Sequence, residues 1–216
     1  MSTTISEQTA ALLEAAGKHL PADVVQAFAD DRATLLAQPA PSGPRVGAKL
    51  PDVSLVDATG KSVSLGEVVT GAPAVIFFYR GAWCPYCNVV LRTYQSELLP
   101  ALRSLGTALV AISPQSPDAS LATAEKAELE YTVLSDARSE VASRLGIAFD
   151  QSEQALGARR KLGLDLRTVN VDGSTTLPMP TVLVTDAAGV VRFVDVHADY
   201  TTRTEVADIL AAVQAL

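Results

Sequence analysis

The chain has 216 residues, of which 48% are hydrophobic and 19% charged, as is typical of a globular protein with a sizeable core. Its net charge of -7 and its lack of a Lys/Arg cluster argue against nucleic-acid binding. The apolar runs are shorter than the roughly 18 residues that cross a bilayer, and residues 1–10 lack the features of a secretory leader. We therefore expect a cytoplasmic protein with no nucleic-acid or membrane partner.

The N-terminal part predicts two helices followed by a linker. Residues 5–37 carry apolar side chains at helical spacing, and Pro21 divides them into two segments. Residues 38–44 are rich in proline, which removes backbone donors, and include a flexible glycine. The predicted division is a helical extension with linker at 1–45 and a second unit at 46–216.

The first half of the second unit predicts a small hairpin and then a buried strand–helix–strand. Apolar runs with β-branched and aromatic residues indicate strands, and apolar residues at helical spacing indicate a helix. The predicted elements are strands 53–56 and 61–65, a central strand 74–79, a helix from Pro85 to Pro100 that extends toward residue 105, and a strand 108–112.

Further along the chain, helices and strands continue to alternate. This alternation indicates an α/β sheet with parallel crossovers, and a turn before Val190 indicates a β-hairpin near the C-terminus. The predicted elements are helix 120–128, strand 131–134, helix 139–145 capped by Ser135 or Asp136, helix 153–162, a loop over 165–177, strands 181–185 and 190–194, and a closing helix 204–216.

The only two cysteines, Cys84 and Cys87, are separated by two residues, which is the spacing of a redox pair. They lie where the central strand ends and an amphipathic helix begins. The free N–H groups and the positive end of the helix dipole at that point favour a thiolate and lower a cysteine pKa. Pro85 suits the first helical turn, where its missing N–H costs nothing. The pair is therefore the predicted chemical centre.

Two neighbours of the cysteines are candidate supporting residues. Arg80 adds a permanent positive charge that stabilises a thiolate or orients a polar substrate oxygen. Trp83 either shields the thiolate and shapes access to it, or simply covers the core. His19 and His197 are interpreted as surface or packing residues.

A zinc site and a pair of inert buried cysteines are the alternatives to a redox centre. Zinc needs further soft ligands, and the chain has no third cysteine and no histidine close in sequence. The strand-to-helix junction favours the redox interpretation over inert cysteines. We expect neither a metal nor a cofactor.

A second candidate segment, residues 177–181, precedes an apolar strand. Proline suits a strand start because it cannot donate to the ladder. The bond between Met179 and Pro180 is a candidate cis peptide that places exposed backbone, together with Thr181, beside the cysteines. An ordinary trans proline is the alternative.

A set of short motifs runs through residues 46–216. They are the segment 46–52 with Gly60, Lys61 and Leu65, the run 77–87, residues 111–113 and 134–136, and Pro180-Thr181 followed by Asp186 and Gly189. Together they resemble the peroxiredoxin-like (AhpC/TSA) family of the thioredoxin-like superfamily, in a variant with a Cys-Pro-Tyr-Cys dithiol. The resemblance implies a thioredoxin-like α/β fold, with a central mixed β-sheet flanked by helices, here with an N-terminal helical extension.

The chain also departs from both templates of that superfamily. Against the peroxiredoxin pattern of Pro, Thr and peroxidatic Cys, the matching positions are Arg80, Cys84 and Cys87, and Pro180 stands where the family has a second active-site Arg. Against thioredoxin, Cys84 matches the attacking cysteine, Cys87 the resolving one and Pro180 the cis proline, but Phe78 replaces a buried acid.

The resemblance implies a thiol peroxidase that reduces a hydroperoxide through a dithiol–disulfide cycle, with an external dithiol such as a thioredoxin-type protein as reductant. The two templates name different nucleophiles, and we prefer Cys84 because the first residues of a helix are more exposed and gain more from the dipole. A thiol–disulfide oxidoreductase acting on protein disulfides and a non-catalytic redox sensor are the alternatives. A homodimer is expected as the commonest assembly.

Overall fold

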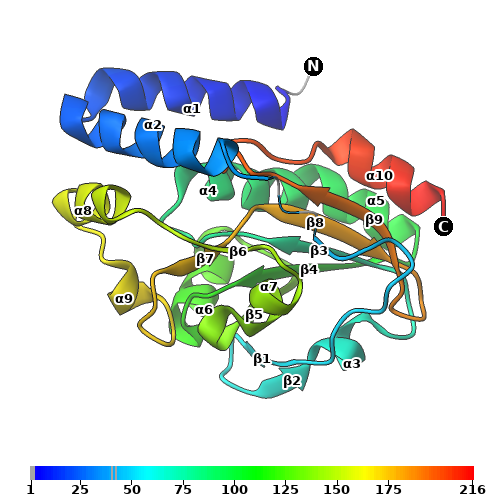
Figure 1. The fold of residues 1–216 in the computed structure, drawn as a ribbon. Coiled ribbons are helices and arrows are strands. Elements are labelled where there is room, and N and C mark those ends of the chain that lie inside the picture. Colours follow the sequence, from blue (N-terminus) through cyan, green and yellow to red (C-terminus); the bar gives the residue numbers. More distant parts are fainter. Residues whose placement is uncertain (1–2, 40, 42) are drawn as a thin grey trace.

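The computed structural model describes residues 3–39, 41 and 43–216, and its centre is a mixed seven-stranded β-sheet (Figure 1). The strands lie in the order β2-β1-β5-β4-β3-β8-β9. Their bounds are β1 Ser54–Asp57, β2 Ser62–Ser64, β3 Ala74–Phe78, β4 Ala108–Ser113, β5 Thr132–Ser135, β8 Thr181–Thr185 and β9 Val191–Val196. A separate antiparallel pair joins β6 Ala148–Asp150 to β7 Thr176–Pro178.

The three central strands β3, β4 and β5 are parallel, whereas β1, β8 and β9 pair antiparallel to their neighbours. Strand β3 is buried along its whole length because helices cover both faces of the sheet. Its side chains alternate between two cores: Ile76 and Phe78 face one, and Val75 and Phe77 face the other. The predicted central mixed sheet flanked by helices is confirmed.

The predicted helices occur in the predicted order, but the one expected from Pro85 toward residue 105 is divided into α4 and α5, and α3 and α9 were not predicted. Their bounds are α1 Ile5–His19, α2 Ala22–Leu36, α3 Leu65–Val69, α4 Pro85–Thr93, α5 Leu99–Ser104, α6 Pro117–Lys126, α7 Glu140–Arg144, α8 Glu153–Lys161, α9 Leu166–Val169 and α10 Val206–Gln214, with a 3₁₀ turn at Ala137–Ser139. A π-helical segment, Tyr94–Leu98, connects α4 to α5. Pro100, in the first turn of α5, has no N–H for an ordinary i to i−4 bond, which explains the local widening.

Helices α1 and α2 form a hairpin in which α1 packs against α4 and α2 runs along α8 (Figure 1). The amino end of α1 is held by Glu205, whose carboxylate accepts hydrogen bonds from the N–H groups of Ile5 (3.0 Å) and Ser6 (2.8 Å). The side chain of Asp31 in α2 accepts a hydrogen bond from the N–H of Ser152, at 2.9 Å. The extension is therefore tied to the rest of the protein at both of its helices.

Two parts of the sequence-based description need correction. Residues 165–177 are not a plain loop, because they contain α9 and the start of β7. The candidate cis bond at Met179–Pro180 is wrong, since no peptide bond among the described residues is cis. Here the Met179 N–H donates to Ile147 O (2.7 Å) and Pro180 O accepts from His197 N–H (2.9 Å), so an extended trans backbone carries β7 into β8.

The structure places no helix of membrane-spanning length and hydropathy in the part of the chain that it describes.

Candidate active site

The loop between β3 and α4 positions the cysteines. Gly81 has a φ of +145°, and a Cβ there would meet the Trp83 Cδ1 at 2.8 Å and the Gln115 Oε1 at 2.9 Å. Gln115 accepts a hydrogen bond from the Ala82 N–H at 2.6 Å, which fixes the loop to the end of β4. The chain therefore folds Trp83 back over Gly81 and places Cys84 directly before the first residue of α4.

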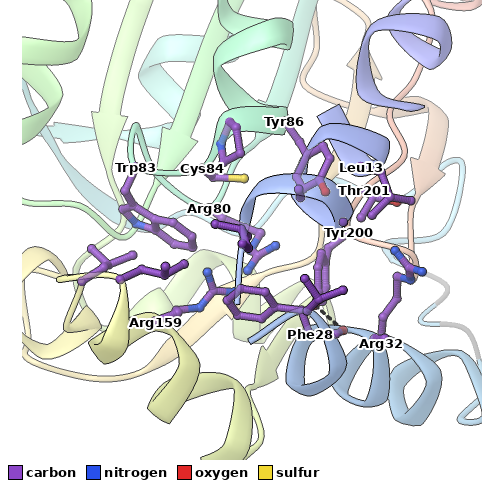
Figure 2. Close-up of a pocket in the computed structure, with 18 residues that line it drawn as sticks. Leu13, Phe28, Arg32, Arg80, Trp83, Cys84, Tyr86, Arg159, Tyr200 and Thr201 are labelled. Carbon is purple, nitrogen blue, oxygen red and sulfur yellow. Dashed lines mark hydrogen bonds between the residues drawn. The ribbon is translucent and has the colours of Figure 1, made fainter. Parts of the chain in front are cut away.

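Cys84 is the N-cap residue of α4, as the sequence predicts, and Pro85 occupies the first helical turn. Cys84 is only 1% exposed, so the expectation that the first residues of this helix are exposed is wrong. Cys84 instead borders a cavity of about 530 Å³ between the domain and the N-terminal hairpin (Figure 2). Arg80, Trp83, Tyr86 and Arg159 line the same cavity. A small molecule that enters the cavity therefore contacts Cys84 and not Cys87.

Cys87, one turn further along α4, is fully buried. Its Sγ accepts a hydrogen bond from the Arg80 backbone N–H at 3.4 Å and another from the Arg203 guanidinium at 3.2 Å. Arg203 is buried as well, and its Nη1 donates to the carbonyls of Tyr200 (2.8 Å) and Thr202 (2.6 Å). The sulfur that the cavity does not reach is therefore held by a fixed cation.

The two thiols have opposite tendencies to ionise. Burial raises the pKa of Cys84, but the hydrogen bond from Cys87 and the positive charges of Arg80 and Arg203 outweigh it and hold that pKa well below its ordinary value. Burial, the hydrogen bond to Cys84 and the negative charge of Cys84 raise the pKa of Cys87 well above its ordinary value. These shifts favour the thiolate at Cys84 and the thiol at Cys87.

Arg80 is a buried cation with unused hydrogen-bonding capacity. Its side chain is 1% exposed, and its guanidinium stacks on the rings of Tyr200 (4.1 Å) and Trp83 (5.1 Å). Its Nε and Nη2 have no hydrogen-bond partner among the described residues. These two N–H groups lie on one edge of the guanidinium plane, so Arg80 offers a two-donor fork for a polar ligand.

A second buried arginine, Arg159 of α8, lies beside Arg80 in the cavity (Figure 2). Its guanidinium stacks on the rings of Trp83 (4.6 Å) and Phe28 (5.0 Å), and its Nε donates to Gln151 Oε1 at 2.5 Å. Burial, followed by the positive charge of Arg80, lowers the pKa of Arg159 to about 9. The two arginines therefore lie close enough to repel each other.

The other candidates from the sequence lie elsewhere. Pro180 and Thr181 border a very small cavity of about 10 Å³ with Arg203, not the Cys84 cavity. The Thr181 hydroxyl donates to Met179 O at 2.9 Å, inside its own turn. His197 is hydrogen-bonded to Asp195 (3.1 Å) and Thr202 (2.8 Å), and burial lowers its pKa. We find no cluster of three or more His, Cys, Asp or Glu side chains placed to hold a metal ion among the described residues.

Sequence reasoning missed three residues of the site: Tyr200, Arg203 and Arg159. They come from two segments far from the cysteines in sequence, and neither segment carries a motif that marks a site. The sequence carried no signal for them. What distinguishes Arg159 and Arg203 from most other arginines of the chain is their burial, which only the structure reveals.

A model of the AhpC/TSA family matches residues 46–194 of the chain. Peroxiredoxin Bcp of Escherichia coli is 32% identical over 111 residues, which are 50% of this chain and 68% of that protein. Peroxiredoxin Q of Sedum lineare is 30% identical over 104 residues, 48% of this chain and 55% of that protein. A Haemophilus influenzae protein that carries the name bcp is 35% identical over 105 residues, 47% of this chain and 64% of that protein. The match spans between about half and two thirds of these relatives.

Solved structures share the fold over most of the chain. The crystal structure of peroxidoxin BcpB from Mycobacterium tuberculosis has a TM-score of 0.61 and 22% sequence identity, and covers 80% of this chain and 98% of that one. Reduced Prx3 from Vibrio vulnificus, crystallised with hydrogen peroxide, has a TM-score of 0.63 and 22% identity over 78% of this chain and 98% of that one. These likenesses establish the thioredoxin-like fold.

Proposed function

The chain belongs to the AhpC/TSA family, and on that premise we propose that it is a thiol peroxidase that reduces hydroperoxides with the pair Cys84 and Cys87. Relatives named peroxiredoxin, from a bacterium and a plant, support this activity. The observation that carries the proposal is the position of Cys84: a buried sulfur with a depressed pKa that borders a cavity beside the unused donors of Arg80.

In the proposed reaction, the Cys84 thiolate attacks the terminal oxygen of the hydroperoxide and breaks its O–O bond. Cys84 becomes a sulfenic acid, and the leaving alkoxide takes up a proton to give an alcohol. The Cys87 sulfur then displaces the hydroxide from Cys84, which leaves as water after protonation, and a Cys84–Cys87 disulfide forms. An external dithiol supplies the two electrons and two protons that restore the pair.

Each neighbour has a proposed role in that sequence. The fork of Arg80 binds the peroxide oxygens and stabilises the negative charge that moves onto the leaving oxygen. Arg203 keeps a positive charge against the sulfurs and holds Cys87 beside Cys84. Trp83 and Tyr200 fix the plane of the Arg80 guanidinium by stacking. Arg203 is a positioning residue, and Pro180 and Thr181 support the backbone next to it.

Reduction of protein disulfides is the second candidate, because Cys-Pro-Tyr-Cys at a helix start is sufficient for it. Cys84 is 1% exposed and lies under the N-terminal hairpin, so a hydroperoxide can enter the cavity but a folded protein reaches the sulfur only when the helices move. This holds for a protein disulfide and for a thioredoxin-type reductant alike. We rank the peroxidase above the disulfide reductase and the non-catalytic sensor because relatives of the chain are named peroxiredoxins.

Turnover assays test the proposal. With a dithiol reductant, we expect the wild-type protein to consume hydrogen peroxide or an organic hydroperoxide, and Cys84→Ser to be inactive. Cys87→Ser should react once and then stop in the absence of added thiol. An active Cys84→Ser protein contradicts our choice of nucleophile. Faster reduction of insulin disulfides than of peroxide would favour the second candidate, and background rates in both assays the sensor.

The remaining predictions concern organisation and partners. We propose a thioredoxin-type protein as the physiological reductant, which requires the hairpin to move away from Cys84. We retain the division into an extension at 1–45 and a domain at 46–216, which the start of the family match at residue 46 supports. A homodimer and a cytoplasmic location stay predictions.

A further inference from the structure

The cavity beside Cys84 is larger than a peroxide group needs, and its outer wall is apolar. At about 530 Å³ it has the size of a small-molecule pocket. The wall away from Cys84 is formed by the hairpin, with Leu13 of α1, Leu20 between the helices, and Val25 and Phe28 of α2 among its side chains. These helices lie outside residues 46–194, so this wall is an addition to the part of the chain that the family model matches.

The charges in the cavity are unbalanced. Neither Arg80 nor Arg159 forms an ion pair with a carboxylate in the described part of the chain. A buried cation without a partner is costly, so such a group calls for an anion. The Cys84 thiolate offsets the charge of Arg80, which directly lowers the Cys84 pKa. The Cys84 thiolate and the buried Asp31 also favour the charge of Arg159, but no carboxylate pairs with its guanidinium directly. Asp31 is linked to it only through Gln151, which donates to Asp31 at 3.4 Å and accepts from Arg159 Nε at 2.5 Å. A hydroperoxide group is neutral and supplies no ion pair to Arg159.

We propose that the cavity binds an organic hydroperoxide with an apolar body and an acidic group, whose carboxylate pairs with Arg159 while its peroxide group reaches Arg80 and Cys84. This inference rests on the proposed peroxidase function and names the substrate class for the same site. The apolar body lies against α1 and α2 and replaces water there.

Other occupants leave part of the cavity unmatched. A small polar reductant, such as a peptide thiol, leaves the apolar wall of α1 and α2 uncovered. A neutral hydroperoxide covers that wall but leaves Arg159 unpaired. Arg32, at the rim, does not share this need because its Nε lies 3.8 Å from the Asp199 carboxylate. An amphipathic acid is the occupant that matches both the wall and the buried charge.

Binding can be measured without turnover, because Trp83 lines the cavity and is the only tryptophan of the chain. We expect 4-isopropylbenzoate to change the Trp83 fluorescence and to bind at least about tenfold more tightly than 4-isopropylbenzyl alcohol, which has the same apolar body without the charge. Equal affinities for the acid and the alcohol, or no response of Trp83 to either, would overturn the proposal.

Variants of Arg159 test whether this residue binds the carboxylate of the ligand. Arg159→Gln should bring the acid-to-alcohol affinity ratio close to one, and Arg159→Lys should restore part of it. Arg192→Gln is the matched control, because Arg192 lies on β9, away from the cavity, and forms its ion pair with Asp186. A ratio that survives in Arg159→Gln, or that falls equally in Arg192→Gln, contradicts the assignment.

Turnover then tests the substrate class. We expect kcat/KM for the para-carboxylate of cumene hydroperoxide to exceed that for cumene hydroperoxide itself, and Arg159→Gln to remove the preference. Selective binding of 4-isopropylbenzoate without any peroxide turnover would overturn the peroxidase function and leave the acid site standing. Turnover of both hydroperoxides at equal kcat/KM would overturn the substrate class and leave the peroxidase standing.

Discussion

Arg203 and Cys87 are 116 positions apart in the chain, yet the Arg203 guanidinium donates a hydrogen bond to the Cys87 sulfur at 3.2 Å inside the protein core. The arginine stands at the end of the segment that leads from β9 into α10. Its place there is fixed by two backbone carbonyls, of Tyr200 and Thr202. A permanent charge is thus held against a dithiol that changes its own charge during the proposed cycle.

Removing that charge should make the dithiol less acidic. The positive charge of Arg203 lowers the pKa of both cysteines, so Arg203→Gln should raise the pKa of Cys84 and shift the onset of thiolate reactivity to higher pH. The pH midpoint of iodoacetamide labelling measures the shift. Arg203→Lys keeps a positive charge, so its labelling midpoint should lie between those of the wild-type protein and Arg203→Gln. An unchanged midpoint in Arg203→Gln would show that Arg203 does not control the thiolate.

The pH dependence of the wild-type protein should also be that of an unusually acidic thiol. Because the pKa of Cys84 is depressed, its labelling rate should be flat from neutral to alkaline pH and should fall as the pH drops through the lowered value. Cys87, whose pKa is raised, should stay protonated over the same range. A labelling rate that climbs up to the ordinary cysteine pKa of about 8.5 would contradict this assignment.

Gly81 should tolerate no side chain. With φ at +145° and Trp83 and Gln115 in the space of a Cβ, Gly81→Ala has to move the indole, and we expect about 1–3 kcal/mol of lost stability together with a shift of the Trp83 emission. Denaturant unfolding measures the first effect. Gly157→Ala, in the interior of α8, is the control and should be neutral or stabilising. An equal free energy of unfolding for Gly81→Ala and Gly157→Ala would refute the role of Gly81.

Most of the fold follows from the sequence because local patterns decide it. The continuous apolar run of β3 and the buried strands beside it predicted a sheet covered on both faces. Pro21 marked the end of α1, Pro85 the start of α4 and Gly106 the end of α5. Short elements were not predicted: β6, β7, α3 and α9 are three to five residues long, too short for a periodicity to appear. Their formation depends on pairing partners distant in the chain.

The site was only half visible from the sequence. Cys84, Cys87, Arg80 and Trp83 lie in one segment, so the strand-to-helix junction alone places them together. Arg159 and Arg203 reach the site through tertiary packing, which no local pattern encodes. Met179–Pro180 was misjudged because its backbone hydrogen bonds to Ile147 and His197 come from segments that the sequence does not place beside it.

Glu205 should control how firmly the hairpin covers the cavity. Its carboxylate accepts from the N–H groups of Ile5 and Ser6, so Glu205→Gln removes a charge from the amino end of α1 and should cost about 1 kcal/mol. Hydrogen exchange in α1 should accelerate. Glu14→Gln, which removes only an exposed pair with Lys18, should change exchange little. Unchanged exchange in Glu205→Gln would mean that packing alone holds the helix.

The most direct test of the dithiol mechanism is a single turnover with one equivalent of hydroperoxide, followed by dimedone labelling and mass spectrometry. We predict that Cys87→Ser is labelled on Cys84, as a trapped sulfenic acid, and that the wild-type protein escapes labelling because it forms the Cys84–Cys87 disulfide and loses two hydrogen atoms in mass. Label on Cys87 in the Cys84→Ser protein with Cys84 unmodified in Cys87→Ser, or a wild-type protein whose mass stays unchanged, would contradict the account.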